Sequence, residues 1–240
     1  MSRGELFLTE THHAGISVAF YRALAEACGA SRGLDVFLTA ERAYGSRRGR
    51  RMALRALRDG NPLDLASYFA YGELTFTDDG TIAKGHRELF EGGVHDCQVD
   101  CRWSREFRAL GAREFGAVYC REIDASIVRG FNPWMRFEAR QNMNMPGCST
   151  CEFYFYGDVG TNFLSSFGDR LKPGQAVKRS MAYACADLYD SLCRTVAEVL
   201  PDRSFELIEG VREALVARYG DGILSELDSY RGTDFERIDG

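Results

Sequence analysis

The residues best suited to chemistry in this sequence are cysteines that fall between positions 97 and 157. Five of the eight cysteines lie there: Cys97, Cys101, Cys120, Cys148 and Cys151. A thiolate is the strongest nucleophile that a side chain offers near neutral pH, and a nearby cation or helix N-terminus lowers the pKa of the thiol. Cys101 precedes Arg102 and lies where a strand is expected to pass into a helix. Cys101 is therefore a candidate nucleophile, beside a cation suited to binding an anionic substrate.

A carboxylate falls at helical spacing from another thiol. Asp124 follows Cys120 by four residues, so on a helix the two side chains project from one face. Cys151 falls on an expected strand. If the sheet packs under this helix, Cys101, Cys120, Asp124 and Cys151 line one pocket, with Asp124 as the acid or base. The competing interpretation is that these buried cysteines are small hydrophobic residues, as expected for Cys28, Cys185 and Cys193.

The same region also fits a metal site. Three residues separate Cys97 from Cys101, and two separate Cys148 from Cys151. Four thiols in two such pairs suit tetrahedral zinc. However, Cys97 and Cys101 alternate along an expected strand rather than lying in a turn. We therefore expect no cofactor, and keep as the alternative a non-catalytic sensory domain that binds a small molecule or a metal through these two thiol pairs.

Polar residues near the cysteines could bind a small anion. Arg140 lies on an expected strand, where an inward-facing arginine is costly unless paired, so it is a candidate carboxylate clamp. Asn132 lies in a turn before Pro133 and is a candidate donor to a developing anion. His95 is close to Cys97 in sequence, but no third group is evident, and we interpret it as a solvated loop residue.

Helical periodicity surrounds this region. Helices are expected at about 16–28, 34–60, 62–69, 103–110, 112–128, 176–200 and 204–218. Strands are expected at 97–101, 134–143 and 150–156, with a small hairpin around the turn at 77–81. This pattern predicts an α+β fold, in which helices pack on a small antiparallel sheet within a single domain of residues 1–240. Residues 175–232 form a C-terminal helical extension, and 232–240 are expected to fray.

Composition restricts the class of protein. The chain has 240 residues and a net charge of −5, so no basic domain is available for nucleic acid. No export signal and no run of about 18 apolar residues is present, which predicts a cytoplasmic protein with reduced thiols. The arginines of 47–51 are interpreted as a solvated helix face, partly balanced by Glu41 and Asp59. The expected partners are a small-molecule substrate and, through an apolar face of the C-terminal helices, a second copy of the chain.

An ordered set of residues resembles the L-2-amino-thiazoline-4-carboxylic acid hydrolase family. The resemblance covers about residues 16–157 and is most specific at 101–153. The matching features are Cys101-Arg102, Leu110-Gly111, Cys120, Asp124, Gly130-Phe131-Asn132-Pro133, Arg140, Met145-x-Gly147 and Cys151-Glu152-Phe153.

The resemblance implies hydrolysis of the cyclic amidine of 2-aminothiazoline-4-carboxylate. In such a reaction a thiolate attacks the ring carbon between nitrogen and sulfur, a carboxylate moves protons, and an arginine holds the carboxylate. The implied catalytic residues are Cys101, Cys120, Asp124 and Cys151, and the implied substrate-binding residues are Arg102, Asn132, Arg140 and Phe153. Cys97, Cys148 and the helices after residue 160 depart from the family pattern, so a related small heterocycle is an alternative substrate.

Overall fold

The fold is α+β, as the sequence predicts. The structure is a computed structural model that describes residues 7–239. The longer helices are α1 (Glu10–Cys28), α2 (Ala30–Arg58), α4 (Arg102–Ala109), α5 (Arg113–Phe131), α7 (Met181–Val199), α8 (Ser204–Tyr219) and α9 (Gly222–Ser229). Short helical segments are α3 (Leu65–Ala70), α6 (Phe163–Ser166), η1 (Phe167–Arg170) and η2 (Pro201–Arg203). The strands are β1 (His86–Phe90), β2 (Gly93–Gln98), β3 (Phe137–Gln141) and β4 (Cys151–Tyr156).

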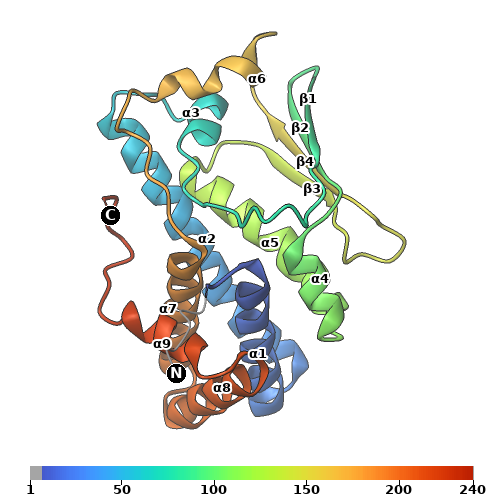
Figure 1. Cartoon of the computed structure of the whole chain (residues 1–240), viewed down its shortest axis with the longest axis vertical. Helices are drawn as coiled ribbons and strands as arrows, with labels where there is room; N and C mark the ends of the chain where they lie inside the picture. Colours follow the sequence, from blue (N-terminus) through green and yellow to red (C-terminus); the bar gives the residue numbers. More distant parts are fainter. Residues whose placement is uncertain (1–6, 240) are drawn as a thin grey trace.

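The four strands form one antiparallel sheet at one end of the molecule (Figure 1). Their order is β1-β2-β4-β3, so the two hairpins meet along β2 and β4. Because successive strand residues point to opposite faces, Val94 and Phe155 share the inner face, where they pack with Val128 of α5. Helix α5 therefore lies between the sheet and α2.

Glycines allow α2 and α5 to pack closely. A Cβ added to Gly49 would lie 2.0 Å from the backbone oxygen of Ile127, and one added to Gly130 would lie 2.2 Å from that of Ser46. Gly45 similarly meets the side chain of Ser126. Only a residue without a side chain fits such contacts, so the spacing Gly45-x-x-x-Gly49 sets the crossing of the two helices that carry Arg48 and Asp124.

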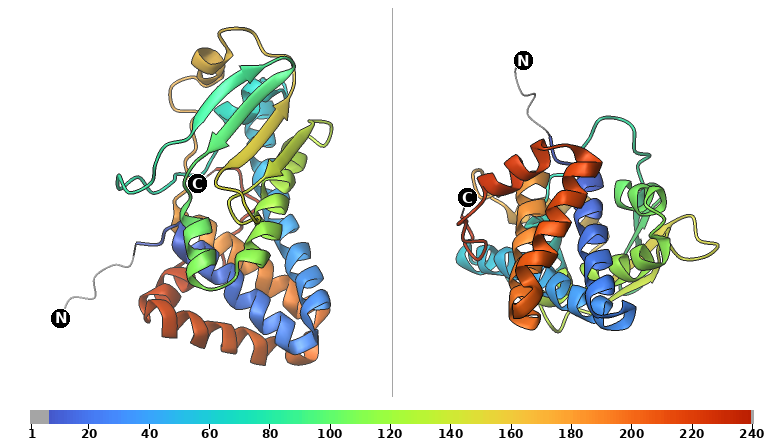
Figure 2. Two further views of the ribbon diagram at one scale, coloured as in Figure 1. Left: turned by 90° about the vertical axis from the view of Figure 1, so that its right-hand side faces the viewer. Right: turned by 90° about the horizontal axis from the view of Figure 1, so that it is seen from below.

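The C-terminal helices α7, α8 and α9 belong to the main hydrophobic core. Buried residues of α7 and α8, among them Leu188, Leu192 and Val211, cluster with Phe20 of α1 and Phe37 of α2. These helices pack beside α1 at the end of the molecule opposite the sheet (Figures 1 and 2). No helix within residues 7–239 combines the length and the apolar character that a membrane span requires.

Several local predictions are wrong. The turn at 77–81 does not join two strands; the first hairpin is β1–β2, whose turn contains Gly92 at a φ of 95°. The third helix begins after Asp64, which caps the amide of Ser67, rather than after Asn61. Residues 232–239 pack against the core, since Phe235 is 4% exposed and its carbonyl accepts a hydrogen bond from Arg51; Gly240 lies outside the described residues.

Candidate active site

A pocket of about 310 Å³ opens at the start of α4, and Cys101 lies on its wall. Cys101 is the residue before α4, with extended backbone angles that hold it at the helix N-terminus. Ser104 of α4 and Met143 of the β3–β4 loop line the same pocket. The volume is at the lower end of the range for small-molecule sites, which suits a compact ligand.

The structure brings together the four groups that the sequence assigned to catalysis. Asp124 and the thiols of Cys101, Cys120 and Cys151 are all close enough for the charge on any one to shift the pKa of another. Cys120 and Asp124 come from one face of α5, Cys151 from the inner face of β4, and Cys101 from the N-terminus of α4. Three elements distant in sequence thus converge on one place.

The β3–β4 loop joins the pocket to the deeper thiols through hydrogen bonds. The hydroxyl of Ser104 donates to the side chain of Asn144 at 2.9 Å, and the amide nitrogen of Asn144 donates to the Cys120 sulfur at 3.4 Å. The backbone N–H of Met143 donates to the Cys151 sulfur at 3.4 Å. Asn144 is 2% exposed. Sequence reasoning missed it, because a loop asparagine gives no sign that it will be buried.

Burial opposes ionisation of all four groups, but to different extents. Desolvation, opposed by the charge of Arg48 and aided by that of Asp96, raises the pKa of the Asp124 carboxyl to about 6. Burial raises the pKa of the Cys120 thiol well above its usual value and that of Cys151 to about 12. Burial also raises the pKa of Cys101, but the backbone N–H groups at the start of α4 oppose this shift. Cys101 therefore has the best local support for a thiolate.

Arg48 is a functional candidate that sequence reasoning missed within the arginine run. Its guanidinium lies 5.5 Å from the centre of the Tyr44 ring and donates to the Tyr44 hydroxyl at 3.4 Å. No carboxylate among residues 7–239 pairs with it at ion-pairing distance, yet its charge lowers the pKa of Asp124. A guanidinium carries five N–H donors, so most of its bonding capacity is unused.

The pocket is electropositive. Arg105, Arg108 and Arg113 all line it. Arg105 pairs with Asp100, whereas Arg108 donates to the carbonyl of Met143 at 2.8 Å, and Arg113 donates to backbone carbonyls of the same loop. Carbonyls do not neutralise a cation, so two of the three charges are uncompensated and favour an anionic ligand.

The expected substrate-binding residues mostly lie elsewhere. Phe153 is on the inner face with Cys151, stacked 6.1 Å from Phe137, as its position in the sequence motif requires. The expectation that Arg140 faces inward is wrong: it is exposed, donates to Glu138 at 3.1 Å, and lies over the Tyr154 ring. The even positions of β3 share the outer face of the sheet, where Arg140 lies with Glu138 and beside Tyr154 and Tyr156 of β4.

The side chains of Asn132 and Arg102 both make contacts that stabilise the fold. The amide nitrogen of Asn132 donates to the Leu63 carbonyl at 2.8 Å, and its side-chain oxygen caps the amide of Trp134. Arg102 forms an ion pair with Asp79 and donates to the Thr81 hydroxyl at 2.9 Å, so it anchors the 77–81 turn. Neither residue lines the pocket beside Cys101.

The two thiol pairs of the zinc alternative do not assemble. Within residues 7–239, which contain all eight cysteines, no three thiols lie close enough to share one ion. Cys97 lies on the outer face of the sheet and donates to Glu152 at 3.4 Å, and Cys148 donates to Gln141 at 3.7 Å. The geometry therefore gives no support to a four-thiol zinc site.

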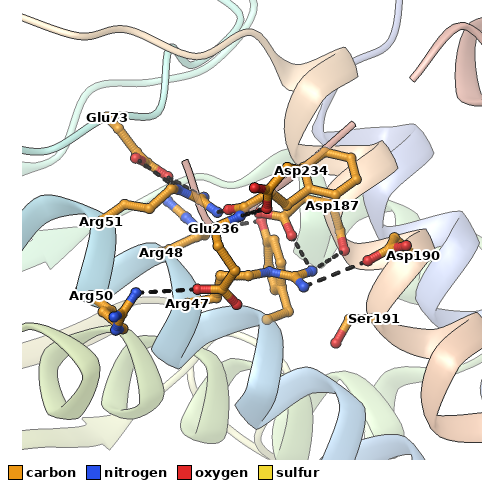
Figure 3. Close-up of polar contacts among 12 residues, drawn as sticks. Arg47, Arg48, Arg50, Arg51, Glu73, Asp187, Asp190, Ser191, Asp234 and Glu236 are labelled. Atoms are coloured by element: carbon orange, nitrogen blue, oxygen red, sulfur yellow. Dashed lines mark hydrogen bonds and ion pairs between the residues drawn. The ribbon is translucent and has the colours of Figure 1, made fainter. Parts of the chain in front are cut away.

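Arg47, Arg51 and Arg55 of α2 form a buried ion network, so the prediction of a solvated face at 47–51 is wrong except at the exposed Arg50. Arg51 and Arg55 are each 1% exposed, and both pair with Glu73. Arg51 also pairs with Asp187 of α7 at 2.9 Å, and Arg47 pairs with the same carboxylate (Figure 3). The network joins α2, the segment after α3 and α7. Arg48 lies beside it (Figure 3), and its charge helps to lower the pKa of Glu73.

Comparison with known proteins identifies the family of this chain. A family model described as L-2-amino-thiazoline-4-carboxylic acid hydrolase matches residues 10–155, from α1 through β4. None of the curated proteins and none of the solved structures gives a match. The matched segment is more than half of the chain and carries Cys101, Cys120, Asp124 and Cys151. The chain therefore belongs to the L-2-amino-thiazoline-4-carboxylic acid hydrolase family.

Proposed function

We propose that this protein hydrolyses a small cyclic amidine, L-2-amino-thiazoline-4-carboxylate or a close relative, with Cys101 as the nucleophile. The observation that carries the proposal is the meeting of three thiols and Asp124 behind an electropositive pocket with Cys101 on its wall. Cys101 is the thiol that combines access from the pocket with a helix N-terminus, and both properties favour attack.

Asp124 is the proton carrier in this proposal. With a pKa of about 6, it is mostly ionised at neutral pH and can take the proton of the Cys101 thiol. No hydrogen bond from the described residues contributes to its pKa, so its oxygens remain available. The Cys101 sulfur then adds to the ring carbon between nitrogen and sulfur.

Ring opening and hydrolysis follow from this adduct. The bond between that carbon and the ring sulfur breaks, and the sulfur takes the proton from Asp124. The carbon is then joined to the Cys101 sulfur and two nitrogens. Water adds to it, giving a proton to Asp124, and the bond to Cys101 breaks, so that the thiolate recovers this proton. The product is a urea with a free thiol, and the net change is the gain of one water.

The pocket arginines supply substrate binding. Arg108 and Arg113 have no acidic partner among the pocket-lining residues, and a guanidinium can hold a carboxylate through two parallel hydrogen bonds. These residues replace Arg140 as the proposed clamp, because Arg140 is exposed on β3 and already paired with Glu138. Substituting either residue by methionine should raise KM more than it lowers kcat.

The test is turnover of L-2-amino-thiazoline-4-carboxylate, followed by free thiol and by product mass. Cys101→Ala should lose at least about 100-fold in kcat, while Cys193→Ala on α7 serves as a matched control with full activity. Full activity in folded Cys101→Ala excludes this thiol as nucleophile. A product that gains one water without a free thiol indicates cleavage of the ring carbon–nitrogen bond instead.

A further inference from the structure

The outer face of the sheet carries a compact set of metal-ligating side chains. Within residues 7–239, His86, Glu88 and His95 place one ligand atom each so that all three atoms lie within 4.8 Å of one another. His86 and Glu88 alternate on β1, and His95 is directly opposite Glu88 on β2. The strand register alone therefore puts all three on one face, the face turned away from α5.

The distances fit a single ion. The Nδ1 atom of His95 lies 3.0 Å from a carboxylate oxygen of Glu88. Two donors bound tetrahedrally to one zinc at about 2.0–2.1 Å are separated by roughly 3.3 Å. For this pair an adjustment of a few tenths of an ångström suffices, and the ligand atom of His86 lies within 4.8 Å of both. His86 and Glu88 are both exposed, so water can complete the coordination.

A second ring of contacts orients His95 for this task. Its Nε2 atom bonds the carboxylate of Glu152 on β4, and that carboxylate also accepts from the Thr150 hydroxyl at 2.6 Å. The ring stacks on Tyr154, with centres 4.5 Å apart and planes 16° apart. Metal-bound histidines usually donate their second ring N–H to such a carboxylate, which fixes the tautomer and the ring orientation.

This arrangement leaves a place for a cation. With Nε2 bonded to Glu152, Nδ1 faces an oxygen of Glu88 at 3.0 Å, a hydrogen-bond distance that a proton on Nδ1 satisfies in the metal-free protein. A divalent ion would displace that proton and bind both atoms. We propose that a divalent transition-metal ion, zinc in the first instance, binds here through His86, Glu88 and His95. The two imidazoles and one carboxylate form the donor set that zinc commonly accepts.

The test is equilibrium dialysis of the metal-free full chain against zinc chloride. One zinc per chain is expected, and His86→Ala and Glu88→Ala should each weaken binding by at least about tenfold. Glu91→Ala, in the turn after β1, is the matched control and should bind as the native protein does. The proposal is overturned if the native protein binds no zinc, or if His86→Ala and Glu88→Ala bind zinc as tightly as the native protein does.

Two further measurements separate this site from the cysteines. Cys97→Ser removes the nearest thiol and should leave zinc binding unchanged. Cobalt, used as a spectroscopic probe, should give no sulfur-to-metal charge-transfer band, because no thiolate belongs to the donor set. Such a band, or loss of zinc binding in Cys97→Ser, shows that thiols bind the ion and contradicts the proposal. Neither measurement depends on hydrolase activity, so each stands apart from the proposed function.

Discussion

Arg48 is expected to keep Asp124 ionised, and Arg48→Met tests this directly. Methionine preserves much of the length and apolar contact of the side chain while it removes the charge. Burial raises the pKa of Asp124 to about 6 despite the charge of Arg48, which lowers it. An opposite charge within about 4–6 Å lowers a carboxyl pKa by about 1–3 units. Arg48 lies beyond ion-pairing distance, so we expect the lower end of this range.

Removal of Arg48 should therefore raise the pKa of Asp124 from about 6 to about 7, a change of roughly 1.4 kcal/mol in the cost of ionisation. At neutral pH the carboxylate would then be about half protonated rather than mostly ionised. If Asp124 is the base for Cys101, the acid limb of the kcat/KM profile should move upward by the same amount.

The pKa is best measured without substrate, by following the side-chain carboxyl carbon of Asp124 by NMR during a pH titration. Asp124→Asn identifies the resonance by its disappearance. Arg50→Met is the matched control, since Arg50 is on the same helix but exposed and paired with Glu236; its removal should leave the titration unchanged. An Asp124 pKa that is equal in Arg48→Met and native protein would refute the electrostatic reasoning.

Three further outcomes follow from the packing. Because burial raises the pKa of Asp124 from 3.8 to about 6, the folded state loses stability as pH rises across this window, by roughly 3 kcal/mol. In urea unfolding at pH 7, Asp124→Asn should therefore be more stable than the native protein by up to that amount, and at about pH 4 the two proteins should be equally stable. A variant that is less stable than the native protein at pH 7 contradicts the raised pKa of Asp124. Arg51→Met removes the cation that two buried carboxylates share, leaving Glu73 with Arg55 and Asp187 with Arg47, and should cost about 3–5 kcal/mol. The exposed Arg50→Met should cost less than about 0.5 kcal/mol, and equal unfolding midpoints for the two variants would argue against a buried network. Gly49→Ala should destabilise the folded protein by at least about 1–3 kcal/mol, because its Cβ would lie 2.0 Å from a carbonyl oxygen. Gly210→Ala, in open space on α8, should stabilise the folded protein by about 0.5–1 kcal/mol. Thermal melts that rank the two variants in reverse would contradict the packing.

Local pattern was sufficient wherever neighbours in sequence decide the structure. The helical period gave α5 and α8 to within a few residues and the end of α1 at Cys28, although α1 begins six residues before the expected start. The turn before Pro133 ended α5 at Phe131, since proline restricts the residue before it. The four-residue spacing of Cys120 and Asp124 placed both on one helix face. The pairing of β3 with β4 also followed from their alternation and the short connection between them.

Long-range contacts decided the rest. Sequence spacing shows that Arg47, Arg48 and Arg51 are on a helix, but not which of them meets Glu73 or Asp187, because those carboxylates arrive from distant segments. Arg140 is exposed and Arg48 is partly buried for the same reason, since the face of the sheet that α5 covers and the crossing of α2 with α5 set their surroundings. A buried charge is stable only beside its partners. The residue types thus determined which reactive groups the chain carries, and tertiary packing decided which of them meet.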